Sequence, residues 1–280
     1  PADQLSIAHY LSNAGYDTVL SGKMHFVGPD QLHGFQRRLT TDIYSCHFDW
    51  VKPEWIRIKE SQGQKYEKVM NNRPRYNAQG YTGEAVKIGK WHNALSYDEE
   101  VHFRSIEFLR SKAQNKNNNP FMLCASYHHP HEPFMPPMEY WNLYEEENIE
   151  IPEFPSNLDE HYSLLDRNLN AYHGTQRVNL RDPEGLTRLR RAYYSLVTYI
   201  DHKVGELLDV LEETGLANNT VVVFTSDHGD MLCEKEMVQK RNLYEWSCRV
   251  PLLVRFPDRW KSGSNFENPV SLLDLLPTFC

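Results

Sequence analysis

The longest patterned stretch of the chain, residues 183–214, predicts a single helix that packs on a sheet. Its apolar residues recur at helical spacing on one face, and Gly215 follows where a left-handed residue can end a helix. Directly afterwards, residues 220–226 form a nearly continuous apolar run rich in β-branched residues. Such a run is typical of a strand covered on both faces in a parallel sheet. A helix followed by a buried strand indicates an α/β fold.

Helix and strand signals alternate along the rest of the chain as well. Ser96 and Glu99 form a capping box that predicts the start of one helix, and Gly15 predicts the end of another. The predicted helices cover residues 3–14 and 96–112, and the predicted strands cover 18–21, 120–126 and 250–254. We therefore expect a doubly wound, mostly parallel sheet flanked by helices. Residues 45–95, rich in aromatic and basic side chains, predict a long irregular insertion over one end of it.

Charge and composition exclude several classes of function. The net charge is -8, from 30 Lys and Arg against 38 Asp and Glu, which disfavours binding to nucleic acid. Apolar runs are too short for a membrane span. Five scattered cysteines without a C-x-x-C pair argue against a disulfide framework or a structural zinc site. A reducing compartment, the cytoplasm, is therefore expected.

Reactive side chains follow the ends of predicted strands, where ligands bind in open α/β sheets. After the first strand, Lys23 offers a point charge for an anionic oxygen and His25 offers a proton carrier. Taken alone, these two are better explained as a solvated lysine and a capping histidine. After residues 220–226, Asp227 and His228 can present an oxygen and a nitrogen to one cation. The alternative is a turn in which an aspartate caps the next helix. Because a buried strand leads directly into these residues, metal ligation by Asp227 and His228 is favoured, and Asp230 is the expected cap.

Three histidines and two prolines gather within residues 128–133, after the strand at 120–126. This composition is unusual for a surface turn and favours a functional site, with His128 expected to be structural. His129 and His131 are then the site candidates. Lys240 lies in a charged segment and by itself predicts only a solvated side chain, unless the fold brings other site residues beside it.

In their order along the chain, these clusters resemble the sulfatase family of the alkaline-phosphatase-like superfamily. The motifs are G-K-x-H at residues 22–25, P-H at 130–131, S-D-H-G at 226–229, and Lys240 ahead of R-V-P at 249–251. Within the family, residues 22–44, 129–133 and 191–194 are similar to the choline-sulfatases nearly residue for residue. Each motif is short, but their joint order is specific and covers almost all 280 residues.

The resemblance implies hydrolysis of a small sulfate ester by a formylglycine nucleophile and a divalent cation, usually calcium. By this resemblance, Asp227 and His228 would bind the metal ion. Lys23 would contact the nucleophile and the sulfate, and His25 would remove a proton. His131 and Lys240 would bind the sulfate and assist the leaving group. For choline sulfate it also implies substrate contacts by Trp50 and His129. A quaternary ammonium binds aromatic faces at roughly 0.5–2 kcal/mol each, and Trp50 is equally well explained as a core or lid aromatic.

The sequence departs from the family in its nucleophile. None of the five cysteines, at positions 46, 124, 233, 248 and 280, lies in a C-x-P-S-R motif, and the paired metal-binding aspartates are also missing. In the family these features precede G-K-x-H. We therefore expect a single catalytic domain truncated at both ends, inactive and poorly folded by itself, which forms a homo-oligomer in the full-length protein. The competing hypotheses are a different sulfatase, a phosphonate or phosphodiester hydrolase, and a non-catalytic anion-binding relic.

Overall fold

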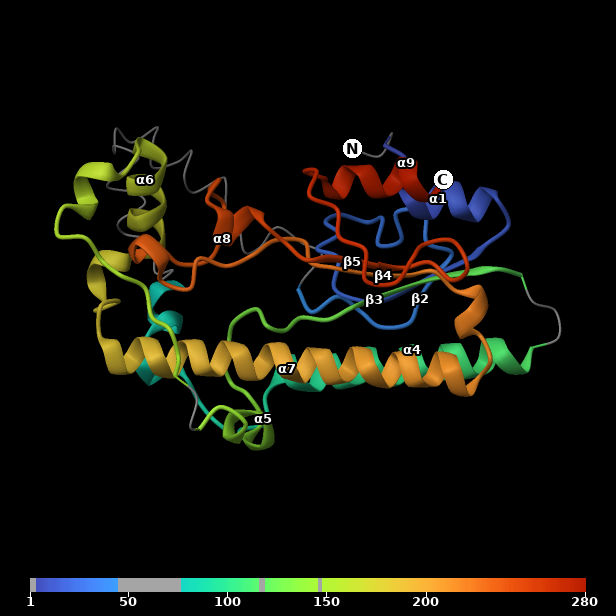
Figure 1. Ribbon diagram of the computed structural model, residues 1–280, viewed down its shortest axis with the longest axis horizontal. Coiled ribbons are helices and arrows are strands. Elements are labelled where there is room, and N and C mark those ends of the chain that lie inside the picture. Colours follow the sequence, from blue (N-terminus) through green and yellow to red (C-terminus); the bar gives the residue numbers. More distant parts are fainter. Residues whose placement is uncertain (1–3, 45–76, 116–118, 146–147) are drawn as a thin grey trace.

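The strands of the protein lie between two layers of helices. The computed structural model describes residues 4–44, 77–115, 119–145 and 148–280. Helices α1 (Ile7–Asn13) and α9 (Leu275–Phe279) cover one side of the strands, and the long helices α4 (Asn93–Gln114) and α7 (Pro183–Glu213) lie side by side on the other (Figure 1). This layering confirms the predicted α/β class with flanking helices.

Strand β1 (Asp17–Gly22) is the centre of a three-stranded parallel sheet with the order β2-β1-β3. Its neighbours are β2 (Arg37–Arg38) and β3 (Phe121–Ser126). Every residue of β1 after the first is buried. Because Gly22 pairs with Ser126, β1 and β3 end at the same edge, and the segments that follow them begin side by side.

Strands β4 (Val222–Thr225) and β5 (Leu252–Arg255) form a separate antiparallel pair. The prediction that residues 220–226 form a strand covered on both faces in the parallel sheet is therefore wrong. Val223 is 37% exposed. In the described part of the chain, β4 pairs only with β5. The other edge of β4 has no neighbouring strand there, and side chains on one of its faces stay partly exposed.

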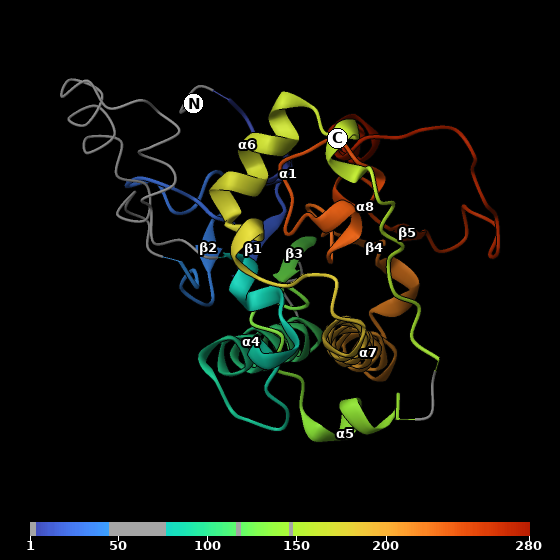
Figure 2. The ribbon, with the colours of Figure 1, turned by 90° about the vertical axis from the view of Figure 1, so that its left-hand side faces the viewer.

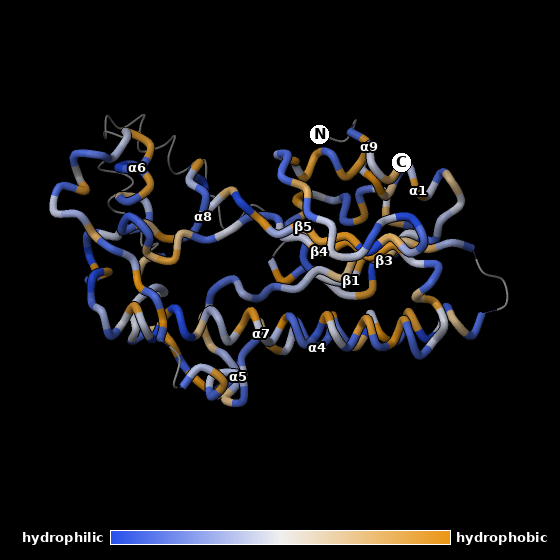
Figure 3. Tube along the Cα trace, viewed as in Figure 1, coloured by the Kyte–Doolittle hydropathy of each residue, from blue (hydrophilic) through white to orange (hydrophobic). Residues whose placement is uncertain are grey.

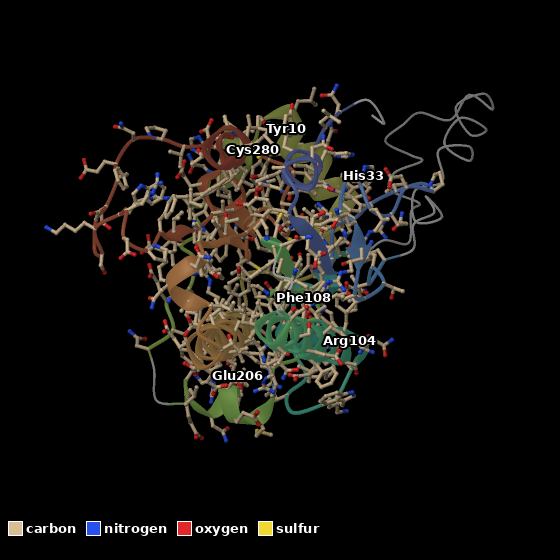
Figure 4. The ribbon with its side chains drawn as sticks, turned by 90° about the vertical axis from the view of Figure 1, so that its right-hand side faces the viewer. Tyr10, His33, Arg104, Phe108, Glu206 and Cys280 are labelled. Carbon is tan, nitrogen blue, oxygen red and sulfur yellow. The ribbon has the colours of Figure 1, made fainter. Side chains whose placement is uncertain are left out.

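Apolar side chains of α4 and α7 fill the space beside the sheet. Phe108 of α4 and Val210 of α7 share one buried cluster with Val19 of β1. Figure 3 shows the strands as a mostly hydrophobic centre between helices of mixed hydropathy. In Figure 4, Phe108 lies on the side of α4 that faces the strands, whereas Arg104 lies on its outer side. Each large apolar side chain buried here contributes about 1.5–3 kcal/mol to folding.

The ends of the helices agree only in part with the sequence signals. Helix α7 is capped by Asp182, whose carboxylate accepts the N–H of Gly185 at 3.0 Å, and its predicted length is confirmed. The prediction that Ser96 and Glu99 cap α4 is wrong, because the helix begins three residues earlier and the Ser96 hydroxyl donates to the His92 carbonyl. The extra turn is stabilised by Leu95, which packs against α7.

The predicted first helix is shorter than expected. It begins at Ile7, and Ser6 and His9 form its capping box. Gly15, with φ of 88°, has the left-handed backbone expected after the helix.

Short helices and 3-10 turns connect the longer elements. Figure 2 shows α4 and α7 nearly end-on, with α5 below them and α6 above. These elements are α5 (Met138–Asn142), α6 (Leu164–His173), α8 (Glu245–Cys248) and 3-10 turns at Asn77–Tyr81, Gly83–Ala85, Leu158–His161, Thr175–Arg177, Ala217–Asn219, Glu234–Glu236 and Leu272–Asp274. Tyr81 and Val86 enter a core cluster with α7. Of the predicted insertion at 45–95, residues 45–76 lie outside the described part, and 77–92 pack against α7.

In the stretches that the structure describes, no helix is both long enough and apolar enough to cross a membrane.

Candidate active site

The G-K-x-H motif forms a turn at the carboxyl end of β1. Gly22 has a φ of 118°, and a Cβ at this position would lie 1.9 Å from the Ser126 carbonyl oxygen. Only glycine allows this approach of β1 to β3. The N–H of Lys23 then donates to the same Ser126 oxygen at 3.0 Å. This close contact aims Lys23 and His25 across the end of the sheet.

A buried carboxylate, that of Asp42, holds this turn in place. Its Oδ2 accepts the N–H groups of Met24 and His25 at 2.9 and 3.0 Å, and the Nη2 of Arg38 at 2.9 Å. Burial alone would raise the pKa of Asp42, but these N–H groups and the charge of Arg38 hold it below its usual value. Asp42 therefore fixes the backbone from which Lys23 and His25 project.

The histidine loop after β3 is held by Asp98 of α4. Asp98 is fully buried and accepts the N–H groups of His128 and His129 at 2.6 and 3.0 Å. The Nδ1 of His129 also lies 2.6 Å from Asp98 Oδ2. Burial lowers the pKa of His128 to about 3, with a further contribution from the neighbouring His131, so this ring is neutral. The anchored loop projects His131 toward the ends of the strands.

The S-D-H-G motif follows β4 and faces the histidine loop. A Cβ on Gly229 would lie 2.0 Å from the Trp246 carbonyl oxygen, so this position also requires glycine. Asp227 Oδ2 lies 3.5 Å from His228 Nε2. Burial would raise the pKa of Asp227, but the charges of His228 and Lys23 hold it below its usual value. Asp227 therefore presents an ionised carboxylate beside an imidazole.

Lys240 completes the group through a direct contact. Its Nζ lies 2.7 Å from Nε2 of His131. Lys240 is partly buried, and this burial, with the nearby charge of Lys23, lowers its pKa, although the Glu132 carboxylate opposes the shift. The prediction of a solvated Lys240 does not hold, because the chain folds it against the histidine loop.

All six predicted catalytic and metal-binding side chains meet at this end of the sheet. In Figure 1 the segment that leaves β3 runs to α5, and the segment that leaves β4 runs toward α8. The ring of Tyr44 lies 4.4 Å from that of His25 and 6.5 Å from that of His131, and the His131 and His228 rings are 6.0 Å apart. The charge of Asp227 acts on Lys23, and the charges of Lys23 and Asp227 act on Lys240. The individual roles of these side chains stay predictions.

A buried lysine, Lys23, and a partly buried one, Lys240, make the site suited to an anion. Lys23 is 7% exposed, and burial lowers its pKa even though Asp227 and Asp42 oppose the shift. Desolvating two ammonium groups at one site is unfavourable unless negative charge lies nearby. A bound anion, with two or more oxygens, would supply that charge in the space between them.

The structure describes only one of the two predicted substrate-binding residues. Trp50 lies outside the described residues. The side chain of His129 is fully buried against Asp98, and its predicted contact with substrate stays a prediction. Asp230, predicted to cap a helix, instead accepts the hydroxyl of Tyr81 at 2.5 Å and the N–H of Leu232 at 2.9 Å, because no helix follows it directly.

Sequence reasoning missed the residues that support the site. They are Asp42, Tyr44, Asp98, Glu132 and Gln239. All are common residue types, and only Asp42, Tyr44 and Glu132 lie in stretches that the motif comparison singled out. Asp98 carried no signal, because its partners are 30 residues further along the chain.

The site fits a divalent cation only in part. Carboxylate oxygen and imidazole nitrogen are suitable donors, and Asp227 and His228 supply one of each. Calcium takes six to eight ligands. Among the described residues, no group of three or more His, Cys, Asp or Glu side chains is arranged to hold a metal ion. This part of the chain therefore offers a pair of ligands and not a complete shell.

The described cysteines do not fit a nucleophile. Cys124 lies within β3, and burial raises its thiol pKa to about 11. Burial raises the pKa of the Cys233 thiol as well, and Cys233 lies against the backbone of Tyr81. Cys248 and Cys280 are exposed. None of these four cysteines is therefore a candidate for the formylglycine nucleophile.

A cavity of about 480 Å³ adjoins the site. Its lining is mostly apolar and includes Ile43, Tyr44, His92 and Pro133, with His128 and Glu132 shared with the site. Such a volume accommodates a small organic group beside the anion position.

Comparison with known proteins identifies the relatives of this chain. The family model described as Sulfatase matches residues 1–280. The chain is 38% identical to a choline-sulfatase of Rhizobium meliloti (strain 1021) over 275 residues, which covers 97% of this chain and 51% of that protein. It is 32% identical to an arylsulfatase of Clostridium perfringens (strain 13 / Type A) over 290 residues, covering 98% and 57%. The chain thus spans about half the length of the curated relatives it matches.

A solved structure shows the same fold. The phosphonate monoester hydrolase SpPMH from Silicibacter pomeroyi superposes with a TM-score of 0.64 at 23% identity, covering 99% of this chain and 57% of that one. The predicted alkaline-phosphatase-like fold class is thereby confirmed.

Proposed function

This chain belongs to the sulfatase family, and from that premise we propose that it is part of a sulfuric ester hydrolase acting on choline sulfate. The whole reaction belongs to the complete protein. No cysteine in this sequence lies in C-x-P-S-R, so the proposal requires a formylglycine from a segment outside these 280 residues. The present residues would bind the sulfate, hold protons near it and supply part of a metal site.

The observation that carries the proposal is the convergence of Lys23, Lys240 and His131 beside Asp227 and His228. The two lysines are separated by more than 200 positions in the sequence; Lys23 is buried and Lys240 is partly buried. Buried ammonium groups bind an oxyanion more strongly than exposed ones, because water competes less for both charges. Lys23 and Lys240 would therefore orient a sulfate group and stabilise charge that develops on its oxygens.

The proton chemistry would fall to the histidines and Lys240. An alkoxide such as that of choline is a poor leaving group, so its oxygen needs a proton as the bond to sulfur breaks. The contacting pair of His131 and Lys240 holds a proton at that side of the site. His25, whose pKa is lowered by burial and by the nearby Lys23, is poised to accept a proton.

Asp227 and His228 would contribute two ligands to a divalent cation, which we propose to be calcium. When bound, such a cation draws charge off the sulfate oxygens. The ionised state of Asp227 favours this ligation.

The choline assignment is supported by the 38% identity to a choline-sulfatase and by the cavity beside the site. Tyr44 offers an aromatic face, and Glu132 offers negative charge at its edge. Both features suit a quaternary ammonium, which cannot accept hydrogen bonds and binds aromatic faces and diffuse negative charge. Trp50 is proposed as a further aromatic contact.

Relative turnover tests this proposal. In the complete protein, kcat/KM for choline sulfate should exceed that for 4-nitrophenyl sulfate and for a phosphonate monoester. Trp50→Ala should raise KM for choline sulfate far more than for the aryl sulfate. Equal losses on both substrates would remove Trp50 from the choline site, and higher kcat/KM for the aryl sulfate would favour an arylsulfatase, the second candidate supported by 32% identity.

The same assay separates choline-sulfatase activity from two further hypotheses, a phosphonate or phosphodiester hydrolase and an anion-binding relic. Preference for the phosphonate monoester would favour the hydrolase. Anion binding without turnover of any of the three substrates would favour the relic.

A further inference from the structure

A buried chain of hydrogen bonds lies behind the contact between His131 and Lys240. The Nδ1 of His131 lies 2.9 Å from Glu132 Oε2 and 3.2 Å from the Glu132 carbonyl oxygen. The other carboxylate oxygen of Glu132 accepts the side-chain amide N–H of Gln239 at 2.5 Å. The Gln239 amide oxygen accepts an N–H of Asn77 at 3.2 Å. Within the part of the chain that the structure describes, Oε2 of Glu132 accepts no hydrogen bond, so Nδ1 of His131 bonds to the Glu132 carbonyl oxygen and the carboxylate acts on the ring through close contact and charge.

The chain of bonds fixes which ring nitrogen of His131 carries the proton. An ammonium has three donors and no acceptor, so Nε2 of His131 must accept from Lys240. The proton of the neutral ring is then on Nδ1, and Glu132 is placed to accept it. In a histidine, the partner of one nitrogen decides the state of the other.

The charge of Glu132 is maintained by the same neighbours. Burial would raise its pKa, but the close contact with His131 and the charge of Lys240 hold it below the usual value. An ionised carboxylate only accepts hydrogen bonds, so it accepts the Gln239 amide N–H and places a negative charge, and no donor, against Nδ1 of His131.

We propose that Glu132, held by Gln239, is a positioning residue that fixes the Nδ1–H tautomer of His131 and so keeps its Nε2 directed at Lys240. This inference rests on the proposed function, in which His131 and Lys240 hold a proton for the leaving oxygen. Gln239 and Lys240 are adjacent in the sequence, so the same segment contacts His131 through Lys240 and Glu132 through Gln239. In this arrangement, as at other sites of this kind, a carboxylate orients a reacting histidine.

An amide cannot replace this carboxylate without a mismatch. If the NH2 of a glutamine at position 132 faces His131, two donors, this NH2 and Nδ1–H, approach each other, which disfavours the Nδ1–H form. If it faces Gln239 instead, two amide NH2 groups meet. Glu132→Gln therefore removes the acceptor-only group while leaving the size of the side chain unchanged.

The test uses the complete protein with 13C- and 15N-labelled histidine. The Cδ2 and ring-nitrogen chemical shifts of His131, assigned by comparison with His131→Gln, report its tautomer. We expect the Nδ1–H form in the wild type and its loss in Glu132→Gln. We also expect kcat to fall about 10–100-fold with KM changed less than about threefold, as for groups that orient a reacting histidine.

Matched variants separate positioning from folding. Glu107→Gln removes a charge from the outer face of α4, where Glu107 pairs with Arg104, and should change neither the tautomer nor kcat. If Glu132→Gln does not fold, Gln239→Met removes one donor from Glu132 and should weaken the Nδ1–H signature and kcat in the same direction.

The two proposals can fail separately. An Nε2–H tautomer in the wild type, or wild-type kcat in a folded Glu132→Gln, would overturn the role of Glu132. Absence of sulfate-ester turnover in the wild type would overturn the proposed function, whereas the tautomer measurement would still decide the role of Glu132.

Discussion

Replacing Asp42 with asparagine tests whether one carboxylate holds the turn that carries Lys23 and His25. Asp42 Oδ2 accepts three hydrogen bonds of 2.9–3.0 Å, from the N–H groups of Met24 and His25 and from Arg38. An asparagine oxygen can accept the two backbone bonds, but it carries no charge for Arg38. The Arg38 side chain is 10% exposed and also donates to the Gly22 carbonyl oxygen at 2.7 Å.

The expected loss follows from this broken ion pair. Removing one partner of a buried pair costs about 3–5 kcal/mol, because the other charge is left uncompensated. At about 2 °C per kcal/mol for a domain of this size, Asp42→Asn should lower Tm by about 6–10 °C. Loosening of the turn should also lower kcat of the complete protein, since Lys23 and His25 project from it.

The pH dependence of this loss has a definite sign. The pKa of Asp42 in the folded protein is below its ordinary value of 3.8. Its stabilisation is therefore complete above about pH 4 and is lost as the pH falls through the lowered pKa. The Tm difference between the wild type and Asp42→Asn should be constant from about pH 5 to 8 and shrink below about pH 4.

Asp30→Asn is the matched control. Asp30 also accepts two backbone N–H groups, from Leu32 and His33 at 3.0 and 2.9 Å, but its side chain is 58% exposed and has no arginine partner among the described residues. Asp30→Asn should have the same Tm as the wild type. If differential scanning calorimetry gives Asp42→Asn the Tm of the wild type as well, the reasoning about the buried ion pair is wrong.

Three further predictions concern two site residues, Gly22 and Lys240, and the buried His173 of α6. Gly22→Ala should lower unfolding free energy by about 2–6 kcal/mol, from backbone strain and the clash with Ser126, and a Tm equal to that of the wild type would contradict the stated geometry. Lys240→Met should lower kcat/KM for choline sulfate about 10²–10⁴-fold in steady-state assays, and a loss below about tenfold would exclude Lys240 from the proton chemistry. Burial lowers the pKa of His173 from 6.5 to about 4, so its neutral form stabilises the fold above about pH 6.5 and this is lost as the pH falls toward about 4. His173→Gln should flatten that decline in urea unfolding, and an unchanged pH slope would contradict the prediction.

The sequence alone predicted the elements whose signals are local. The apolar spacing of residues 183–214 predicted α7, and the order of the short motifs predicted the family and all six residues that meet at the site. Side-chain periodicity and strand-end chemistry are properties of neighbouring residues, so they can be read along one segment. The same local rules placed the start of α4 wrongly at Ser96, because Leu95 gains its burial from α7, about 100 residues away.

Only the tertiary structure decided how the site is held together. Asp42, Asp98 and Glu132 are ordinary acidic residues in the sequence, yet each binds two or more donors at the site. The strand at 220–226 has the composition of a buried strand, but its exposure depends on which strands lie beside it. Hydrogen bonds and burial are set by partners distant in the chain, and folding selects those partners through the packing of all the elements together. A sequence pattern can therefore name reactive residues, whereas the groups that fix their charge and orientation emerge only when the chain is folded.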